Sequence, residues 1–203
     1  MSESDNFSEH KDEKKLQLCM AEFEFVWTQM HQRMSGVSNL ISLSAAFFAF
    51  AVGFVISNDN NTNLDYELLI TTSFTIPFFV IGSLIAREDF FMLSHDAYII
   101  EILRPRMLKL SGSENDHDLL TFIYSMDKLK TSNFSTFLGI ARYLFAILGL
   151  LFVLVMIWNN GPTPASGTWW ACFVCTVALV FALLLMMFSI KQIADRNYAQ
   201  RKS

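Results

Sequence analysis

Four long apolar runs dominate the pattern of hydrophobic and polar positions along the chain. They cover residues 37–56, 68–86, 138–158 and 169–190. Each has about the ~20 residues that a helix needs to cross a hydrocarbon core of ~30 Å. None contains Asp, Glu, Lys or His, and Arg142 is the one charged residue within them. We therefore predict an all-α integral membrane protein with four transmembrane helices, arranged as two hairpins.

The segments between and before these runs also show helical spacing. In residues 15–34 apolar side chains recur every three or four positions, so this stretch is expected to continue as a helix into the first run. The stretch 87–107 has the same spacing and is expected to pack against it, with Pro105 ending or kinking the helix. A further helix is predicted over residues 114–130, with acidic residues in its first turn and lysines at its end.

These elements divide the chain into three parts. Residues 1–11 are acidic and rich in Ser, which predicts a disordered tail. Residues 12–110 form a first hairpin unit with its helical extensions, and residues 111–203 form a second. The shared order of elements indicates either a duplication or two hairpins made alike by the membrane.

The placement of basic residues predicts the orientation in the membrane. Lys and Arg are absent from the connections 57–67 and 159–168. Apart from Arg142, they all lie in the segments 1–36, 87–137 and 191–203. Positive residues favour the cytoplasmic side, so both termini and the central segment are expected in the cytoplasm. We expect Arg142 to extend to the lipid headgroups on that side.

Composition narrows the choice of partners. The chain is 53% hydrophobic and 17% charged, whereas soluble domains are about 25% charged. Its formal net charge of −4 does not suit nucleic acid, which binds basic surfaces. The partners that we expect are membrane lipid, further copies of the chain and a cytoplasmic protein.

Small side chains mark one face on each of two spans. Such residues let helix backbones approach closely in lipid. We predict that one of these faces packs inside the subunit and that the other joins subunits in a homo-oligomer. The residues concerned are Ser42, Ala45, Ala49 and Gly53 in the first span, and Cys175, Ala178 and Ala182 in the fourth.

Polar residues gather in the second span around a proline. Pro77 lacks an N–H and leaves the carbonyl of Ser73 without its helical donor. The hydroxyls of Thr72 and Thr75 can bond to the backbone or to a neighbouring helix. A kinked packing helix is the preferred interpretation, and a pore lining is the alternative.

Charged and aromatic residues flank the first hairpin on the cytoplasmic side. Arg33 precedes the first span and Glu88 and Asp89 follow the second, so an antiparallel hairpin brings them to similar depth. We predict an ion pair from Arg33 to one of these two acids. The alternative to this ion pair is independent solvation of the charges. A separate hypothesis is a site that uses His31, His95 and Asp96. The candidate cytoplasmic contact residues are Trp27, His31, Arg33, Glu88, Asp89 and His95.

No sequence motif supports an enzyme, a metal or a cofactor. The chain has no Gly-rich phosphate loop, no Gly-x-Ser-x-Gly and no HExxH. Cys172 and Cys175 form a CxxC inside the fourth span, without a second pair or a nearby His. Because zinc needs about four ligands, packing is the better account of these cysteines.

The sequence before the first span resembles a known group of membrane proteins. The run FVWTQMHQRM, with Trp27, His31, Gln32 and Arg33, and the stretch 87–107 resemble the bacterial SLATT-like membrane effectors found near phage-defence enzymes. The resemblance covers at most the first 110 residues. It implies cytoplasmic helices that sense or bind a partner and spans that perturb the membrane. The second hairpin departs from the two-span pattern, so the pore mechanism does not carry over directly.

The function that we expect is that of an oligomeric effector or sensor subunit in a bacterial inner membrane. In this interpretation it acts in anti-phage defence, by assembly and membrane perturbation with a cytoplasmic partner. One alternative is a small channel or transporter lined by the Thr-rich second span. Another is a passive membrane scaffold for a soluble enzyme.

Overall fold

The structure is a computed structural model, and it describes residues 3–57, 64–111, 141–159 and 167–200. All regular structure in these ranges is helical. Three of the helical stretches are long and apolar enough to cross a membrane, and they lie within Asp12–Val55, Leu68–Ser111 and Gly167–Arg196. The third predicted span, residues 138–158, corresponds to a shorter apolar helix, Leu144–Asn159. The helix predicted over residues 114–130 lies outside the described residues.

The first helix, α1, is one continuous rod of 55 residues, Glu3–Ser57. It passes through Gly36 without interruption, as the absence of a strong breaker predicts. At 1.5 Å per residue it is about 80 Å long, well beyond the thickness of a hydrocarbon core. It also includes residues 3–11, where the sequence predicted disorder. Extending an existing helix is far less costly than nucleating one, which accounts for the longer element.

The second long helical stretch, residues 64–111, contains two irregular points, and each lies near a proline. α2 (Leu64–Ser73) and α3 (Thr75–Tyr98) are separated by Phe74, whose N–H donates to the carbonyl of Thr71 at 3.2 Å. Pro77 offers no N–H to Ser73, so the regular bonding pattern is broken one turn before it. The predicted irregularity at Pro77 is therefore present as a break between two helices.

Near Pro105 the rod widens instead of ending. A π-helical turn, η1, covers Ile99–Leu103, and α4 continues over Arg104–Ser111. The N–H of Arg104 donates to the carbonyl of Ile99, five residues back. Because Pro105 has no N–H and its ring crowds the preceding turn, a wider turn accommodates it at this point.

The remaining helices form the second pair. α8 covers Leu144–Asn159 and α9 covers Gly167–Gln200. α8 begins later than the predicted span, after a turn at Arg142 and Tyr143. Residues 138–140 of that predicted span lie outside the described ranges.

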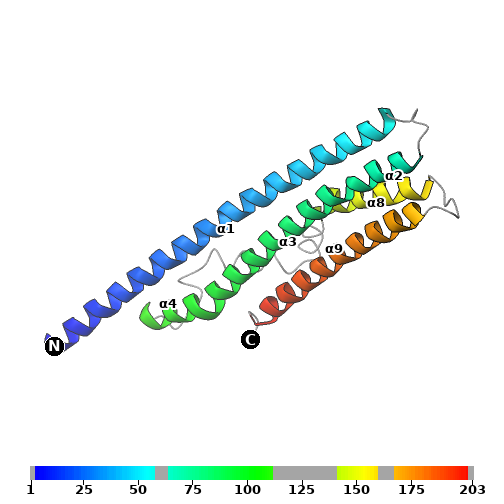
Figure 1. The fold of residues 1–203 in the computed structure, drawn as a ribbon. Coiled ribbons are helices and arrows are strands. Elements are labelled where there is room, and N and C mark those ends of the chain that lie inside the picture. Colours follow the sequence, from blue (N-terminus) through cyan, green and yellow to red (C-terminus); the bar gives the residue numbers. More distant parts are fainter. Residues whose placement is uncertain (1–2, 58–63, 112–140, 160–166, 201–203) are drawn as a thin grey trace.

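The helices form an elongated bundle with a thinner extension at one end (Figure 1). α1 runs antiparallel to the α2–α3–α4 rod, and α3 contacts α1, α8 and α9. Beyond the ends of α8 and α9, the first half of α1 continues beside the end of α3, η1 and α4. We call this two-helix extension, formed by residues 12–33 and 89–111, the stem.

Each part has its own apolar core. In the bundle, Phe47 of α1 meets Phe74 and Phe78 edge to face, with ring centroids 5.8 and 5.1 Å apart. In the stem, Val26 packs against Ile99 and Leu103, flanked by Phe23, Met30 and Tyr98. The expected packing of the stretch 87–107 on the stripe of residues 15–34 is thus present, centred on Val26.

Neighbouring helices pack tightly at two glycines outside the predicted small-residue faces. A Cβ added at Gly149 would lie 2.3 Å from Cε1 of Phe78, and one at Gly82 would lie 2.8 Å from Cδ1 of Leu183. By contrast, Gly53 has open space around it. Ser42, Ala49, Cys175 and Ala178 are exposed, and Ala45 and Ala182 are half-buried. The prediction that one of these faces packs inside the subunit is wrong, because α1 turns its phenylalanines toward the bundle instead.

Candidate functional site

The candidate site is a cluster of charged residues where the stem meets the bundle. The apolar part of α3 ends at the buried Ala86, and Arg87, Glu88 and Asp89 follow directly. Consecutive residues on a helix point about 100° apart. Glu88 and Asp89 therefore face different neighbouring helices.

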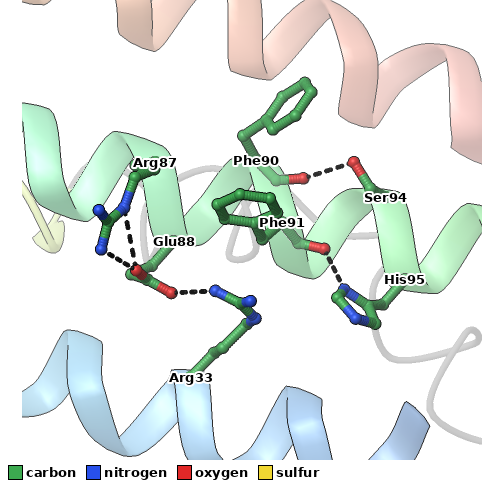
Figure 2. Close-up of polar contacts among 7 residues, drawn as sticks. All are labelled: Arg33, Arg87, Glu88, Phe90, Phe91, Ser94 and His95. Carbon is green, nitrogen blue, oxygen red and sulfur yellow. Dashed lines mark hydrogen bonds and ion pairs between the residues drawn. The ribbon is translucent and has the colours of Figure 1, made fainter.

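Glu88 joins α3 to α1. Nη1 of Arg33 lies 2.6 Å from Oε2 of Glu88, and Nη2 of Arg87 lies 2.7 Å from Oε1, so each carboxylate oxygen has a partner (Figure 2). The Arg33 guanidinium also lies 4.3 Å from the centre of the Phe91 ring, a cation–π arrangement. Of the two partners that the sequence predicted for Arg33, the structure selects Glu88.

The charges around Glu88 stabilise its ionised form. The hydrogen bond from Arg87 and that from Arg33 lower the pKa of Glu88 below its ordinary value of 4.5, although partial burial opposes them. A carboxylate that accepts hydrogen bonds from two guanidinium groups holds its charge more firmly than an isolated one. Glu88 is therefore expected to remain charged at neutral pH.

Asp89 joins α3 to the start of α8. Nη1 of Arg142 lies 2.5 Å from Oδ1 of Asp89, and the hydroxyl of Tyr143 donates to Oδ2 at 2.8 Å. Asp89 is 7% exposed, so its charge is nearly removed from water and depends on these two donors.

Arg142 therefore does not behave as the sequence suggested. We expected it to extend to the lipid headgroups, whereas its guanidinium pairs with Asp89. A buried carboxylate at the same depth attracts a neighbouring cation strongly, since the surroundings screen the interaction less than water does. A lone Arg at the start of a span, together with two adjacent acids of which Arg33 was expected to pair with one, was the signal in the sequence that could have found this pair.

His31 and His95 are each hydrogen-bonded to the backbone of their own helix. Nδ1 of His31 donates to the carbonyl of Trp27 at 3.1 Å, and the two rings lie 4.9 Å apart. Nδ1 of His95 donates to the carbonyl of Phe91 at 2.6 Å (Figure 2). Within the described ranges no group of three His, Cys, Asp or Glu residues could hold a metal.

A further polar contact in the stem was not predicted. The hydroxyl of Tyr98, at the end of α3, donates to Oε1 of Glu22 on α1. This hydrogen bond to a carboxylate raises the pKa of Tyr98 above its ordinary value of 10.0. It lies next to the Val26 cluster and fixes the two stem helices relative to each other.

The hydroxyls of the second span bond to their own backbone. Thr72 Oγ1 donates to the carbonyl of Leu68, and Thr75 Oγ1 donates to that of Thr72, both at 2.6 Å. Thr75 is also buried. This geometry favours the kinked packing helix that we preferred over a pore lining.

The cysteines in the described part of the chain are free thiols. Cys172 is buried and Cys175 is exposed, so the two members of the CxxC face different surroundings. Cys172 therefore occupies a packing position as expected, whereas Cys175 does not.

At the far end of the bundle an aromatic contact ties α8 to α9. Nε1 of Trp169 donates to the carbonyl of Ile157 at 2.8 Å, and its ring stacks on Phe173 with centroids 5.2 Å apart. Trp158 is exposed beside them. Exposed tryptophan at the end of an apolar helix is typical of a membrane interface.

Comparisons of the chain with protein-family models, with curated proteins and with solved structures find no match. In the part of the chain that the structure describes, all regular structure is helical, and three helices are long and apolar enough to cross a bilayer. Chemically, the charged cluster can position helices against one another, through two adjacent carboxylates that contact different neighbours.

Proposed function

We propose that this chain is a subunit of a bacterial inner-membrane effector or sensor, in which a cytoplasmic stem controls a four-span bundle. The basic residues at the stem end support a cytoplasmic location of the stem and both termini under the positive-inside rule. α8 serves as the remaining span in this proposal. Its 16 residues reach about 24 Å, and the preceding turn extends it toward the headgroups.

The observation that carries the proposal is the continuity of the stem helices with two of the spans. α1 passes from the stem into the bundle without a break, and α3 continues from Thr75 to Tyr98 as one helix. A packed pair of helices moves as a rigid unit. A partner that shifts the stem would therefore displace the spans as well.

Self-association is the second part of the proposal. The small residues Ser42, Ala49 and Gly53 lie on an exposed face of α1. Because small residues allow close contact between helices in lipid, this face supports assembly of several copies. A protein that perturbs a membrane by assembly needs such a face on the outside of the subunit.

Membrane potential in living bacteria is the direct test. We expect expression of the full chain to dissipate the membrane potential reported by a voltage-sensitive dye. If the protein acts in anti-phage defence, as the resemblance to SLATT-like effectors implies, phage infection should increase this effect. A Leu103→Asp variant places a charge in the stem core and is expected to abolish the response. The neighbouring Ile102→Asp variant, at an exposed position, is the matched control.

Two results would contradict the proposal. One is a membrane potential that stays unchanged at all expression levels and during infection. The other is a purely monomeric protein in mild detergent, measured by light scattering after size-exclusion chromatography. Ion flux in liposomes that depends on Thr72 and Thr75 would favour the channel alternative.

A further inference from the structure

The two ends of α8 are held by different kinds of contact. At its carboxyl end, the buried Trp169 donates to the carbonyl of Ile157 and stacks on Phe173. At its amino end, two polar side chains in the preceding turn, Arg142 and Tyr143, bond to Asp89 of α3. The first contact is largely apolar and remote from the stem. The second is ionic and lies at the base of the stem.

The contact at the amino end is suited to two states. Arg142 and Tyr143 bond to separate oxygens of one carboxylate, so the bonded state satisfies the buried Asp89 fully. Arg142 is 31% exposed, so water can reach the pair from one side. Both donors lie in the turn that precedes α8, so they can leave Asp89 with the loss of no more than the first turn of that helix.

The stem is attached to the same point of α3. Glu88, the residue before Asp89, bonds to Arg33 at the base of the stem helix α1. Two consecutive carboxylates therefore connect α1 and α8 through one turn of α3. A rotation of that turn by the stem would change both contacts together.

We propose that Asp89 is a releasable latch, through which the stem controls the position of the cytoplasmic end of α8. In the closed state Arg142 and Tyr143 hold α8 against α3. When the latch opens, α8 pivots about its Trp169 end and separates from α3 where Gly149 receives the Phe78 ring. The structural part of this inference stands alone, and its effect on the membrane rests on the proposed function.

A pair of cysteines can report the closed state. A Cβ built at Gly82 of α3 lies 3.4 Å from Cβ of Ala146 of α8, close to the ~3.5–4.5 Å range of disulfides. The nearest obstacle is the flexible end of Leu183. We would place Gly82→Cys and Ala146→Cys in the full chain with Cys19, Cys172 and Cys175 changed to Ala, and follow disulfide formation in membranes under mild oxidation.

Opening the latch should slow this crosslink. Asp89→Ala is expected to reduce its rate roughly tenfold or more, as expected for losing hydrogen bonds to a charged group. Tyr143→Phe should give a smaller reduction, because Arg142 remains bonded. Exchanging the charges, with Asp89→Arg and Arg142→Asp together, should restore much of the rate. Asp12→Asn is the control, since it neutralises a half-exposed carboxylate whose partner Lys15 lies on the same helix.

Amide hydrogen exchange provides a second measurement that needs no cysteine. The N–H of Ile147 donates to the carbonyl of Tyr143 at 2.9 Å, so it reports on the first turn of α8. Asp89→Ala should speed exchange at this amide roughly tenfold, while amides around Trp169 stay as protected as in the unaltered chain.

The possible results separate the latch from the proposed function. Crosslinking and exchange that are the same in the Asp89→Ala variant and its parent would overturn the latch. Faster exchange throughout α8 and α9 would also overturn it, because it would indicate general unfolding instead of a pivot. If both structural signals change as expected while the membrane potential does not, the latch stands and the effector function fails.

Discussion

At the scale of single residues, Glu88 and Asp89 differ in partner because one step along a helix turns the side chain by about 100°. Glu88 contacts the stem helix α1, whereas Asp89 contacts the turn before α8. The sequence placed both acids at the depth of Arg33 but could not decide which faces it. That choice depends on how α3 is rotated within the bundle, which is a property of the tertiary packing.

Removing the buried carboxylate should lower stability. Asp89→Ala is expected to reduce the free energy of unfolding by about 1–3 kcal/mol, because Arg142 and Tyr143 lose their acceptor. Unfolding in mixed micelles measures this change. Asp12→Ala is the control, since its pair with Lys15 is about half exposed and should contribute less than about 0.5 kcal/mol. Equal losses in the two variants would contradict the expectation.

The contribution of Glu88 to the stability of the folded protein should depend on pH. Its pKa is lowered in the folded protein by Arg87 and then by Arg33. Its contribution to stability is therefore present above its ordinary pKa of 4.5 and is lost as the pH falls through the lower folded value. Glu88→Gln should remove this part of the acid dependence. Thermal unfolding of both proteins from about pH 7 to pH 3 checks the prediction, and superimposable pH profiles would refute it.

At the scale of elements, the packing of α3 against α8 depends on one position of α8 that carries no side chain, Gly149. Gly149 lets the Phe78 ring lie directly on the α8 backbone. An isolated glycine forms no row of small residues, so the sequence pattern does not reveal that this one lies opposite a phenylalanine.

Adding one methyl group at that position should test the packing. Gly149→Ala places a Cβ 2.3 Å from Phe78 Cε1 and is expected to destabilise the bundle by about 1–3 kcal/mol. Gly53→Ala is the matched control, because nothing lies within 4 Å of its added Cβ. The measurement is again unfolding in micelles, and a Gly149→Ala variant as stable as Gly53→Ala would show that α3 and α8 do not pack this closely.

The elements also show where sequence reasoning succeeds and where it stops. The helical class and three of the membrane-length helices follow from the apolar runs, because length and composition are local properties. The start of α8 does not follow, since Arg142 and Tyr143 are drawn into a turn by Asp89. The hydrophobic pattern also does not predict the π-helical turn at Ile99–Leu103. Pro105 predicts a disturbance there, but packing against α1 decides its form.

At the scale of the whole molecule, the proposed orientation makes opposite predictions for the two ends of the bundle. Cys19 lies on the stem and Asn159 lies at the exposed far end of α8. In a chain with Cys172 and Cys175 changed to Ala, a membrane-impermeant maleimide should label Cys19 only after the cells are opened. With Cys19 also changed to Ala, an Asn159→Cys variant should be labelled in intact cells. The reverse pattern would invert the topology.

The unbroken α1 helix also has a mechanical consequence. It is held to α3 at Arg33, which divides the 55-residue rod into arms of about 45 Å on the stem side and about 36 Å on the span side. In the proposed orientation, such a rod would act as a lever with its fulcrum near the membrane surface. A sideways displacement at the stem tip would appear at the opposite membrane face in the reverse direction and at about four fifths of its size. The chain could thus carry a signal across the bilayer by a tilt alone, without changing the length or secondary structure of any helix.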